Sequence, residues 1–438
     1  MKPGDTITVM AQLLSRHGDG VGTVEGVEIH AAGLLPGETG EVTLDYVSRQ
    51  RPRAHGAVVR RRNTHPGRRT PPCRHHGRCN GCPVMDMEPQ HQRRLKQAEL
   101  KEQYGLEIDR LVALDGDGLR YRWSSKRVFS GERGAVFLGS YMPGTHNVAD
   151  MAGCLVDHPD IVAACEELIE ITNSIRAEPY DEIEECGDLR YAWLKTDGRG
   201  HVLLTIVTAE PQCHVVHEIA ERLRVPAGIA WGVNSRRGND MRGTTVRPLR
   251  GRQSLQVDLA GTEVHVGPLG FLQPNPAAAA LAYRDLVRVP AGGLLHGRVA
   301  LDLYAGAGIT TSLLRKQFER VIPSESYPES ARALGITPEL VEDFLARLLA
   351  DPRGRARQVD LVVANPPRSG MGKAVCDQLN QLAAPRLHIM SCGPASLSED
   401  LRRLTGPEGS YRVLQARAYD TLPQTNHIEI VTWLVGRS

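Results

Sequence analysis

The chain has 438 residues, of which 41% are hydrophobic and 24% charged, and its formal net charge is +2. This length exceeds what one hydrophobic core usually organises, and the composition is that of a soluble globular protein, so we expect two or three domains. No stretch approaches the roughly 20 apolar residues of a membrane helix. Residues 1–5 lack the apolar core of a signal peptide, which predicts a cytoplasmic protein with no membrane partner. The nine cysteines are an odd number, which argues against a disulfide framework and favours metal binding or catalysis.

Residues 1–62 are predicted to form short strands separated by turns. Ile7 and Val9 alternate with polar neighbours, and the turn at 35–38 (Leu-Pro-Gly-Glu) precedes a further apolar strand at 42–44. Several short strands at this spacing predict a small closed barrel of the oligonucleotide-binding kind. The turn followed by a strand also resembles a TRAM domain.

The basic stretch at 49–78 contains ten arginines and no acidic residue. Arginine pairs with phosphate through two parallel hydrogen bonds, so this stretch is a candidate phosphate-binding surface. The alternative is a solvated basic linker.

Three cysteines lie within ten residues, in the pattern Cys73-x5-Cys79-x2-Cys82, and Cys154 is a candidate fourth ligand. Glycines at 77 and 81 supply tight turns between them. Four thiolates suit either zinc or an iron–sulfur cluster, and the spacing alone does not decide between the two. A helix is predicted to follow at 90–104, which is rich in Leu, Lys, Gln and Glu.

Toward the C-terminus the pattern changes to strands that alternate with glycine loops and helices. Strands are predicted at 299–304, 359–364, 387–391 and 428–435, and a helix at 309–318. This alternation is typical of a doubly wound α/β domain. We therefore expect a barrel at 1–62, a central α+β domain at 63–285 and a Rossmann-like α/β domain at 286–438.

The loop at 302–308 (Asp-Leu-Tyr-Ala-Gly-Ala-Gly) follows an apolar strand, and such a loop lies where α/β sheets bind ligands. Gly306 allows the backbone to approach a bound nucleoside closely. The loop lacks the G-x-G-x-x-G spacing of dinucleotide sites. Glu325, at the end of the next predicted strand, is placed to accept hydrogen bonds from ribose hydroxyls. Together these features favour an S-adenosylmethionine site.

Three further candidates lie at strand ends. Asn365 begins an Asn-Pro-Pro-Arg segment whose prolines fix the backbone just beyond a strand. Cys392 follows an apolar strand and is predicted to face the cofactor cleft. Glu429 is a carboxylate among apolar neighbours, where a raised pKa would suit a general base.

Taken together, these segments resemble the uracil-5 RNA methyltransferases that act on 23S ribosomal RNA and tRNA, especially the ribosomal branch with a TRAM domain and an iron–sulfur cluster. The resemblance covers nearly the whole chain, with the motifs in the family's order. It implies that Cys73, Cys79, Cys82 and Cys154 ligate a 4Fe–4S cluster, and that Gln273, Tyr304, Gly306, Glu325 and Asn365 contact S-adenosylmethionine. It also implies that Cys392 is the nucleophile and Glu429 the base.

The implied reaction is methylation of uracil at carbon 5 after Cys392 attacks carbon 6. A stacked uracil is inaccessible, so the target must be flipped out or lie in a loop of structured RNA, and 23S ribosomal RNA is the favoured partner. The chain is expected to act as a monomer.

The chain departs from the family at several positions. Asparagine stands at 365 where the family usually carries aspartate, and Gly393 replaces a common asparagine. The stretch between Glu325 and Asn365 is short, which leaves Asp343 as the candidate for the adenine contact. These departures concern cofactor affinity and rate more than reaction type.

Three alternatives stay open. The first is a tRNA uridine-5 methyltransferase. The second is an RNA-binding homologue with impaired catalysis. The third is an exocyclic amino methyltransferase, for which Asn-Pro-Pro is typical, although Arg368 replaces the expected aromatic residue and Cys392 would then have no purpose.

Overall fold

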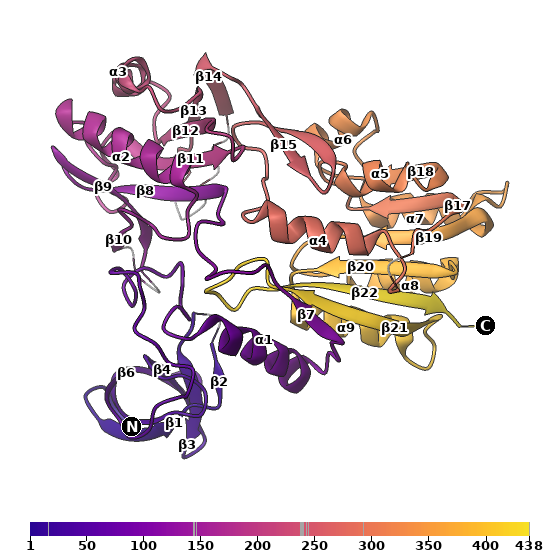
Figure 1. Cartoon of the computed structure of the whole chain (residues 1–438), viewed down its shortest axis with the longest axis horizontal. Helices are drawn as coiled ribbons and strands as arrows, with labels where there is room; N and C mark the ends of the chain where they lie inside the picture. Colours follow the sequence, from indigo (N-terminus) through magenta and orange to yellow (C-terminus); the bar gives the residue numbers. More distant parts are fainter. Residues whose placement is uncertain are drawn as a thin grey trace.

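The computed structural model describes residues 1–437 except 16, 143, 144, 146, 237–240, 242, 244 and 292. Three large sheets and one hairpin organise the chain, and Figure 1 shows the three sheets as separate bodies. In this described part, no helix combines the length and apolar character needed to cross a membrane.

The first sheet has the strand order β1-β5-β6-β4-β3-β2. Its strands are β1 Thr6–Met10, β2 Leu13–Leu14, β3 Gly20–Val24, β4 Val27–Ala32, β5 Thr39–Val47 and β6 Arg53–Arg61. β1 and β2 are neighbours in the chain but lie at opposite ends of the strand order, and the Gln12 amide donates to the Val21 carbonyl at 2.8 Å. The sheet therefore curls around an apolar core that includes Val9, Ile29 and Val42. Its identity as a TRAM domain stays a prediction.

The second sheet has the order β10-β9-β8-β11-β12-β13-β14. Its strands are β8 Ser124–Glu132, β9 Ala135–Tyr141, β10 Val148–Asp150, β11 Leu189–Thr196, β12 Val202–Thr208, β13 Gly228–Val233 and β14 Thr245–Gly251. Helices α2 Pro159–Ser174 and α3 His214–Arg222 pack on it through a shared apolar core. A mixed, mostly antiparallel sheet with helices agrees with the α+β character predicted for the middle of the chain.

The third sheet has the order β18-β17-β19-β20-β22-β21-β7. Its strands are β7 Arg110–Val112, β17 Gly297–Leu303, β18 Phe318–Ser324, β19 Val359–Ala364, β20 Arg386–Ser391, β21 Tyr411–Tyr419 and β22 Glu429–Gly436. β17 to β20 are parallel, whereas β22 runs antiparallel between β20 and β21. The central strands β17 and β19 are apolar and largely buried, as expected for parallel strands covered on both faces.

Six helical segments join the strands of the third sheet: α5 Ile309–Leu314, α6 Pro328–Leu334, α7 Val341–Leu349, the short 3₁₀ helix η1 Arg355–Gln358, α8 Gly372–Leu382 and α9 Pro394–Thr405. The helix predicted at 309–318 is too long. It ends at Leu314 because β18 already begins at Phe318, where it pairs with Gly297 of β17. Between β18 and β19 the chain forms helices and loops but no strand. β18 is the edge strand on that side of the sheet.

Several segments from the middle of the chain pack against the third sheet. They are α1 Pro89–Tyr104, the hairpin β15 Leu255–Leu259 and β16 Thr262–Val266, and α4 Pro276–Leu286, and β7 joins the sheet itself. α4 begins cleanly because Pro276 occupies its first turn and the Asn275 side chain accepts a hydrogen bond from the Ala278 amide at 3.2 Å. The division into 1–62, 63–285 and 286–438 therefore stays a prediction. Elements from residues 63–285 pack on or join the third sheet, so the second and third bodies are not separated at residue 285.

Candidate active site and cysteine cluster

The carboxyl ends of four parallel strands meet at one edge of the third sheet. β17 leads into the loop at 304–308, β18 into Glu325, β19 into Asn365 and β20 into Cys392. β22 runs in the opposite direction and starts with Glu429, so Glu429 lies at the same edge. The topology thus gathers candidate residues that are far apart in the sequence.

Cys392 and Glu429 are neighbours across two antiparallel strands. Ser391 of β20 pairs with Ile430 of β22, so the next residue along β20 falls opposite Glu429. Burial raises the pKa of the Cys392 thiol, and the charge of Glu429 raises it further. Burial also raises the pKa of Glu429 to about 7. The guanidinium of Arg368 opposes both pKa shifts, which places a positive charge beside this pair.

A close backbone contact brings Arg368 to the cysteine. The Ser396 hydroxyl donates to the Arg368 carbonyl at 2.9 Å and lies 3.0 Å from the Gly393 carbonyl. A Cβ atom at position 393 would lie 2.6 Å from the Arg368 carbonyl oxygen. Gly393 therefore permits the approach of the two loops, which gives a physical reason for this departure from the family pattern.

Gln273 and Asn365 meet at a buried tyrosine. The Gln273 amide lies 3.4 Å from the Tyr283 hydroxyl, and Asn365 also hydrogen-bonds this phenol. Burial, together with the charges of Glu429 and Asp302, raises the pKa of Tyr283 to about 12, so the phenol that accepts from the Gln273 amide stays neutral. Tyr283 was missed by the sequence analysis because an aromatic residue on an alanine-rich helix is indistinguishable from core; its spacing from Gln273 was the only available signal.

The glycine loop is held by Glu325. One carboxylate oxygen accepts a hydrogen bond from the Gly306 amide and the other from the Tyr327 amide, both at 2.7 Å. Tyr304 adopts a left-handed backbone conformation (φ 60°), which is strained for a tyrosine. A Cβ atom at Gly306 would have only the Tyr304 carbonyl nearby, at 4.0 Å, so space is open on this side of the loop.

Asp343 does not join this group. Its side chain is exposed in the first turn of α7, whereas the preceding Glu342 is half-buried and its charge raises the pKa of Tyr304. Glu342 is therefore the carboxylate of this segment that faces the glycine loop, and the sequence pattern did not distinguish the two adjacent acids.

The segment at 420–427, which precedes Glu429, is anchored on α1. The buried Lys96 ammonium contacts the Asp420 carboxylate at 2.7 Å and the carbonyls of Leu422 and His427 at 3.2 and 3.1 Å. Gln92 and Gln424 exchange two hydrogen bonds at 2.8 and 3.1 Å. Glu429 is thus positioned by a helix more than 300 residues earlier in the chain.

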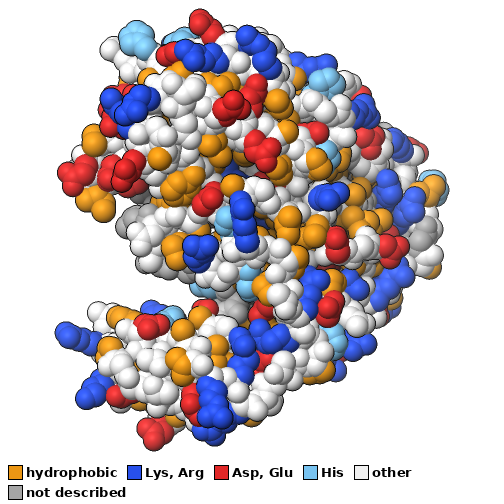
Figure 2. All heavy atoms as spheres, turned by 60° about the vertical axis from the view of Figure 1, so that its left-hand side comes forward, with side chains coloured by type: hydrophobic (Ala, Val, Ile, Leu, Met, Phe, Trp, Pro, Cys, Tyr) orange, Lys and Arg blue, Asp and Glu red, His pale blue; other side chains and the backbone are white. Residues whose placement is uncertain are grey.

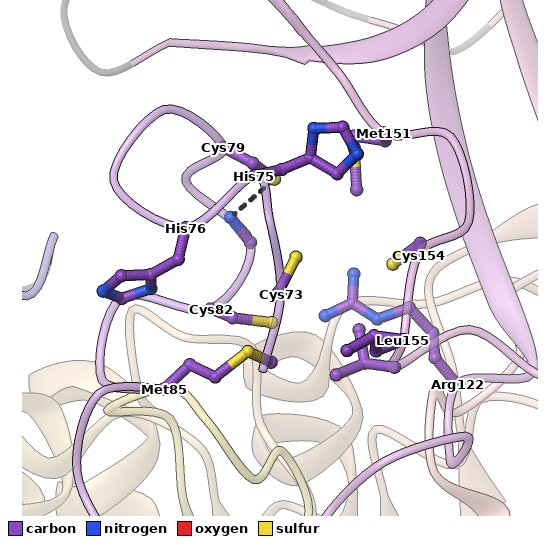
Figure 3. Close-up of a pocket in the computed structure, with 12 residues that line it drawn as sticks. Cys73, His75, His76, Cys79, Cys82, Met85, Arg122, Met151, Cys154 and Leu155 are labelled. Carbon is purple, nitrogen blue, oxygen red and sulfur yellow. Dashed lines mark hydrogen bonds between the residues drawn. The ribbon is translucent and has the colours of Figure 1, made fainter. Parts of the chain in front are cut away.

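The four predicted cysteine ligands line one cavity. Figure 3 shows Cys73, Cys79, Cys82 and Cys154 around a common space, into which the guanidinium of Arg122 also points. No three of their sulfur atoms lie within 4.8 Å of one another. Nε of Arg122 is buried and has no hydrogen-bond partner in the structure.

The cavity and the segment before Glu429 share a wall. Leu422 packs with Met85 and Tyr121 at the cysteines, and the Tyr121 hydroxyl donates to the Pro423 carbonyl at 3.0 Å. The Val84 amide donates to the Gln424 carbonyl at 3.3 Å.

The basic stretch divides into two classes of arginine. Arg68 is mostly buried and holds the linker on the first sheet through Glu38, at 2.6 Å, and Asp86, at 2.5 Å. Other members are exposed, namely Arg49, Arg51, Arg60 and Arg78. Figure 2 shows a deep notch between the lobe formed by β1–β6 and the rest of the molecule, with Lys and Arg side chains on that lobe.

Comparisons with known proteins find similar sequences among RNA methyltransferases. Residues 344–437 match the family model described as tRNA (uracil-5-)-methyltransferase. An uncharacterized RNA methyltransferase of Parasynechococcus marenigrum is 28% identical over 99% of this chain and 96% of the relative. One of Geobacter sulfurreducens is also 28% identical, over 100% of this chain and 91% of the relative.

A solved structure supports the fold. It is the Pyrococcus abyssi tRNA (uracil-54, C5)-methyltransferase in complex with S-adenosyl-L-homocysteine, which matches with a TM-score of 0.75 over 98% of this chain and 100% of that chain. The two sequences are 20% identical, so the likeness shows a shared fold.

Proposed function

Residues 344–437 match the tRNA (uracil-5-)-methyltransferase family model, and two relatives that span almost the whole chain are named RNA methyltransferases, so we propose that the chain is an S-adenosylmethionine-dependent enzyme of this kind that methylates carbon 5 of a uridine in structured RNA through a covalent cysteine adduct. The observation that carries this proposal is the pair formed by Cys392 and Glu429, with Arg368 beside it, at the carboxyl edge of the sheet. A nucleophile and a base side by side are what the reaction needs.

The reaction balances with these two residues. The Cys392 thiolate adds to carbon 6 of uracil, and the electrons of the carbon 5–carbon 6 bond form an enolate. Carbon 5 then takes the methyl group of the sulfonium, and S-adenosylhomocysteine is released. Glu429 removes the proton from carbon 5, the double bond re-forms, and the thiolate leaves. The positive charge of Arg368 stabilises the thiolate before the attack.

The neighbouring groups have positioning roles. Gln273 and Asn365 are the proposed cofactor contacts, and both bind Tyr283, whose neutral phenol can fix their orientation. Glu325 fixes the glycine loop through the Gly306 amide. We keep Tyr304 as a proposed cofactor contact, and Glu342 is better placed than Asp343 to take part.

The proposed RNA contacts are the exposed arginines of the basic stretch, which would bind phosphates without reading sequence. The notch in Figure 2 offers room for RNA between the lobe formed by β1–β6 and the rest of the molecule. Two RNAs are candidates: the motif resemblance favours 23S ribosomal RNA, whereas the family description and the Pyrococcus abyssi neighbour favour tRNA.

The four cysteines fit a 4Fe–4S cluster better than a zinc ion. A tetrahedral zinc site with Zn–S bonds of about 2.3 Å would hold its sulfurs about 3.8 Å apart. No three of the sulfurs here lie within 4.8 Å of one another, so the four do not form a tetrahedron of that size. Thiolates and sulfides of an anionic cluster would also accept a hydrogen bond from the orphaned Nε of Arg122. The cluster would hold the chain together at this point, because methyl transfer from a sulfonium needs no electron.

Two variants test the mechanism. Cys392→Ala should lose methylation but still bind S-adenosylmethionine, with the exposed Cys186→Ala as the matched control. Glu429→Gln should methylate once and accumulate a gel-stable protein–RNA adduct that the double variant Cys392→Ala/Glu429→Gln lacks. Release of tritium from carbon 5 of labelled uracil should accompany turnover. Methylation by Cys392→Ala would refute the covalent route.

The competing functions predict different results. An amino methyltransferase would methylate RNA without releasing tritium from carbon 5, and a catalytically impaired homologue would not bind S-adenosylmethionine. Mapping 5-methyluridine in 23S ribosomal RNA and tRNA from cells lacking the protein identifies the substrate as the RNA from which the methyl group is lost.

A further inference from the structure

A second group of metal-ligating side chains lies on the first sheet, away from the cysteines. Ligand atoms of Asp19, His30 and His55 all lie within 4.8 Å of one another, and all three residues are half-buried. Neither the reaction proposed above nor the cysteine cluster uses them.

The strand register explains why the two histidines meet. β4 and β6 are parallel, and His30 is the direct partner of His55. Their neighbours Ile29, Ala31 and Ala54 point into the barrel core, so both imidazoles project from the outer face. The rings stack with centroids 4.6 Å apart and planes 30° apart.

Asp19 completes the group from the turn before β3. The Ser15 hydroxyl lies 3.3 Å from one Asp19 carboxylate oxygen and accepts the Asp19 amide at 3.1 Å, so the turn holds the carboxylate toward the histidines. Glu28, two residues before His30 on the same face, lies 2.8 Å from Nε2 of His30. In metal sites such a carboxylate orients the imidazole and leaves its other nitrogen to coordinate.

We propose that Asp19, His30 and His55 bind a divalent transition-metal cation, with Zn²⁺ as the reference ion. Two imidazoles and one carboxylate are a ligand set that Zn²⁺ takes with water in its remaining position.

A cation here would tie the turn before β3 to β4 and β6. This turn also touches two distant segments: Gly18 packs directly against Pro83, next to Cys82, and the Asn426 amide donates to the Ser15 carbonyl at 2.7 Å. The bound ion would therefore stabilise the contact of the barrel with the cysteine loop and with the segment that precedes Glu429. The inference does not depend on the proposed reaction.

The test is Zn²⁺ titration of tag-free full-length protein by calorimetry, combined with thermal unfolding. Wild type should bind one more equivalent of Zn²⁺ than His55→Gln or Asp19→Asn, because any Zn²⁺ on the cysteines is common to all three. Zn²⁺ should raise Tm of wild type more than Tm of either variant, while all three share the same Tm in chelator. Glu28→Gln should weaken binding by about 10- to 100-fold.

His265→Gln is the matched control. His265 also lies on a strand two residues after a glutamate, Glu263, at 4.0 Å, but its imidazole is exposed and its partner on the neighbouring strand is Gln256. This variant should bind Zn²⁺ as wild type does. Equal Zn²⁺ stoichiometry in wild type, His55→Gln and Asp19→Asn would overturn the proposal, and so would equal loss in His265→Gln. If His55→Gln does not fold, Asp19→Asn decides, because its turn is outside the barrel core.

Discussion

Replacement of Arg368 by glutamine should shift the pH dependence of methylation upward. The guanidinium faces two groups that must be anionic, the Cys392 thiolate and the Glu429 carboxylate, and it lowers the pKa of both. Removing the positive charge raises both pKa values, so the anionic forms appear only at higher pH. Activity should fall at neutral pH and recover as the pH rises.

The magnitude follows from the exposure of Arg368. A hydrogen bond to a charged group contributes about 1.5–3 kcal/mol when well shielded. Arg368 is exposed, so solvent screening favours the lower end. About 1.4 kcal/mol corresponds to one pKa unit and a roughly tenfold loss of thiolate at fixed pH.

The assay is the rate of Cys392 alkylation by iodoacetamide, followed by mass spectrometry over a pH series without RNA. Single-turnover methylation should show the same upward shift. Arg368→Lys keeps the positive charge and should therefore retain most of the wild-type pH dependence. The control is Arg412→Gln. Arg412 is exposed and lies at the end of β21 that is far from Glu429. An unchanged alkylation profile with uniformly weaker RNA binding would refute this reasoning, because Arg368 would then act on RNA alone.

Three further predictions concern the cysteines, the helix anchor and Asn365. Anaerobically purified protein should be brown with about four irons per chain, lost together in Cys73→Ser or Cys154→Ser, whereas a colourless protein with one zinc would contradict the cluster. Lys96→Met should lower the free energy of unfolding by about 3–5 kcal/mol in denaturant titrations, because it leaves the Asp420 carboxylate buried and unpaired, and an unchanged midpoint would contradict this. Asn365→Asp should strengthen S-adenosylmethionine binding or single-turnover methylation by roughly one to two powers of ten, since it restores a charge near the sulfonium, and a loss in both measurements would contradict this account.

The sequence predicted several of the C-terminal strands well because their signals are local, but β21 was not predicted. The apolar runs that became β19 and β20 were predicted within one residue of their observed ends, and turn residues bound each run. The helix after the glycine loop was predicted too long, because its end is decided by where β18 must start to pair with β17. That constraint is tertiary and leaves no mark in helix periodicity.

The candidate site likewise contains some residues that could be predicted from the sequence and others that could not. Cys392 and Glu429 could be predicted from strand ends and family resemblance, and the antiparallel register then places them side by side. Tyr283 could not be predicted, because nothing in an alanine-rich helix indicates that one phenol reaches Gln273 and Asn365. The anchoring of Gln424 could not be predicted either, because its partner Gln92 lies 332 positions earlier in the chain.

The anchoring of residues 420–427 on α1 also sets the order of events during translation. Lys96 leaves the ribosome 324 residues before its partner Asp420, an interval of roughly 16–65 s at ~5–20 residues per second. Throughout that time its ammonium lacks the Asp420 carboxylate and the carbonyls of Leu422 and His427, so the buried face of α1 cannot reach its final packing. The nascent chain therefore has to keep this helix accessible until nearly all of the polypeptide is made. A ribosome that stops before residue 420 would release a protein that lacks not only Glu429 but also the packing of a helix made long before it.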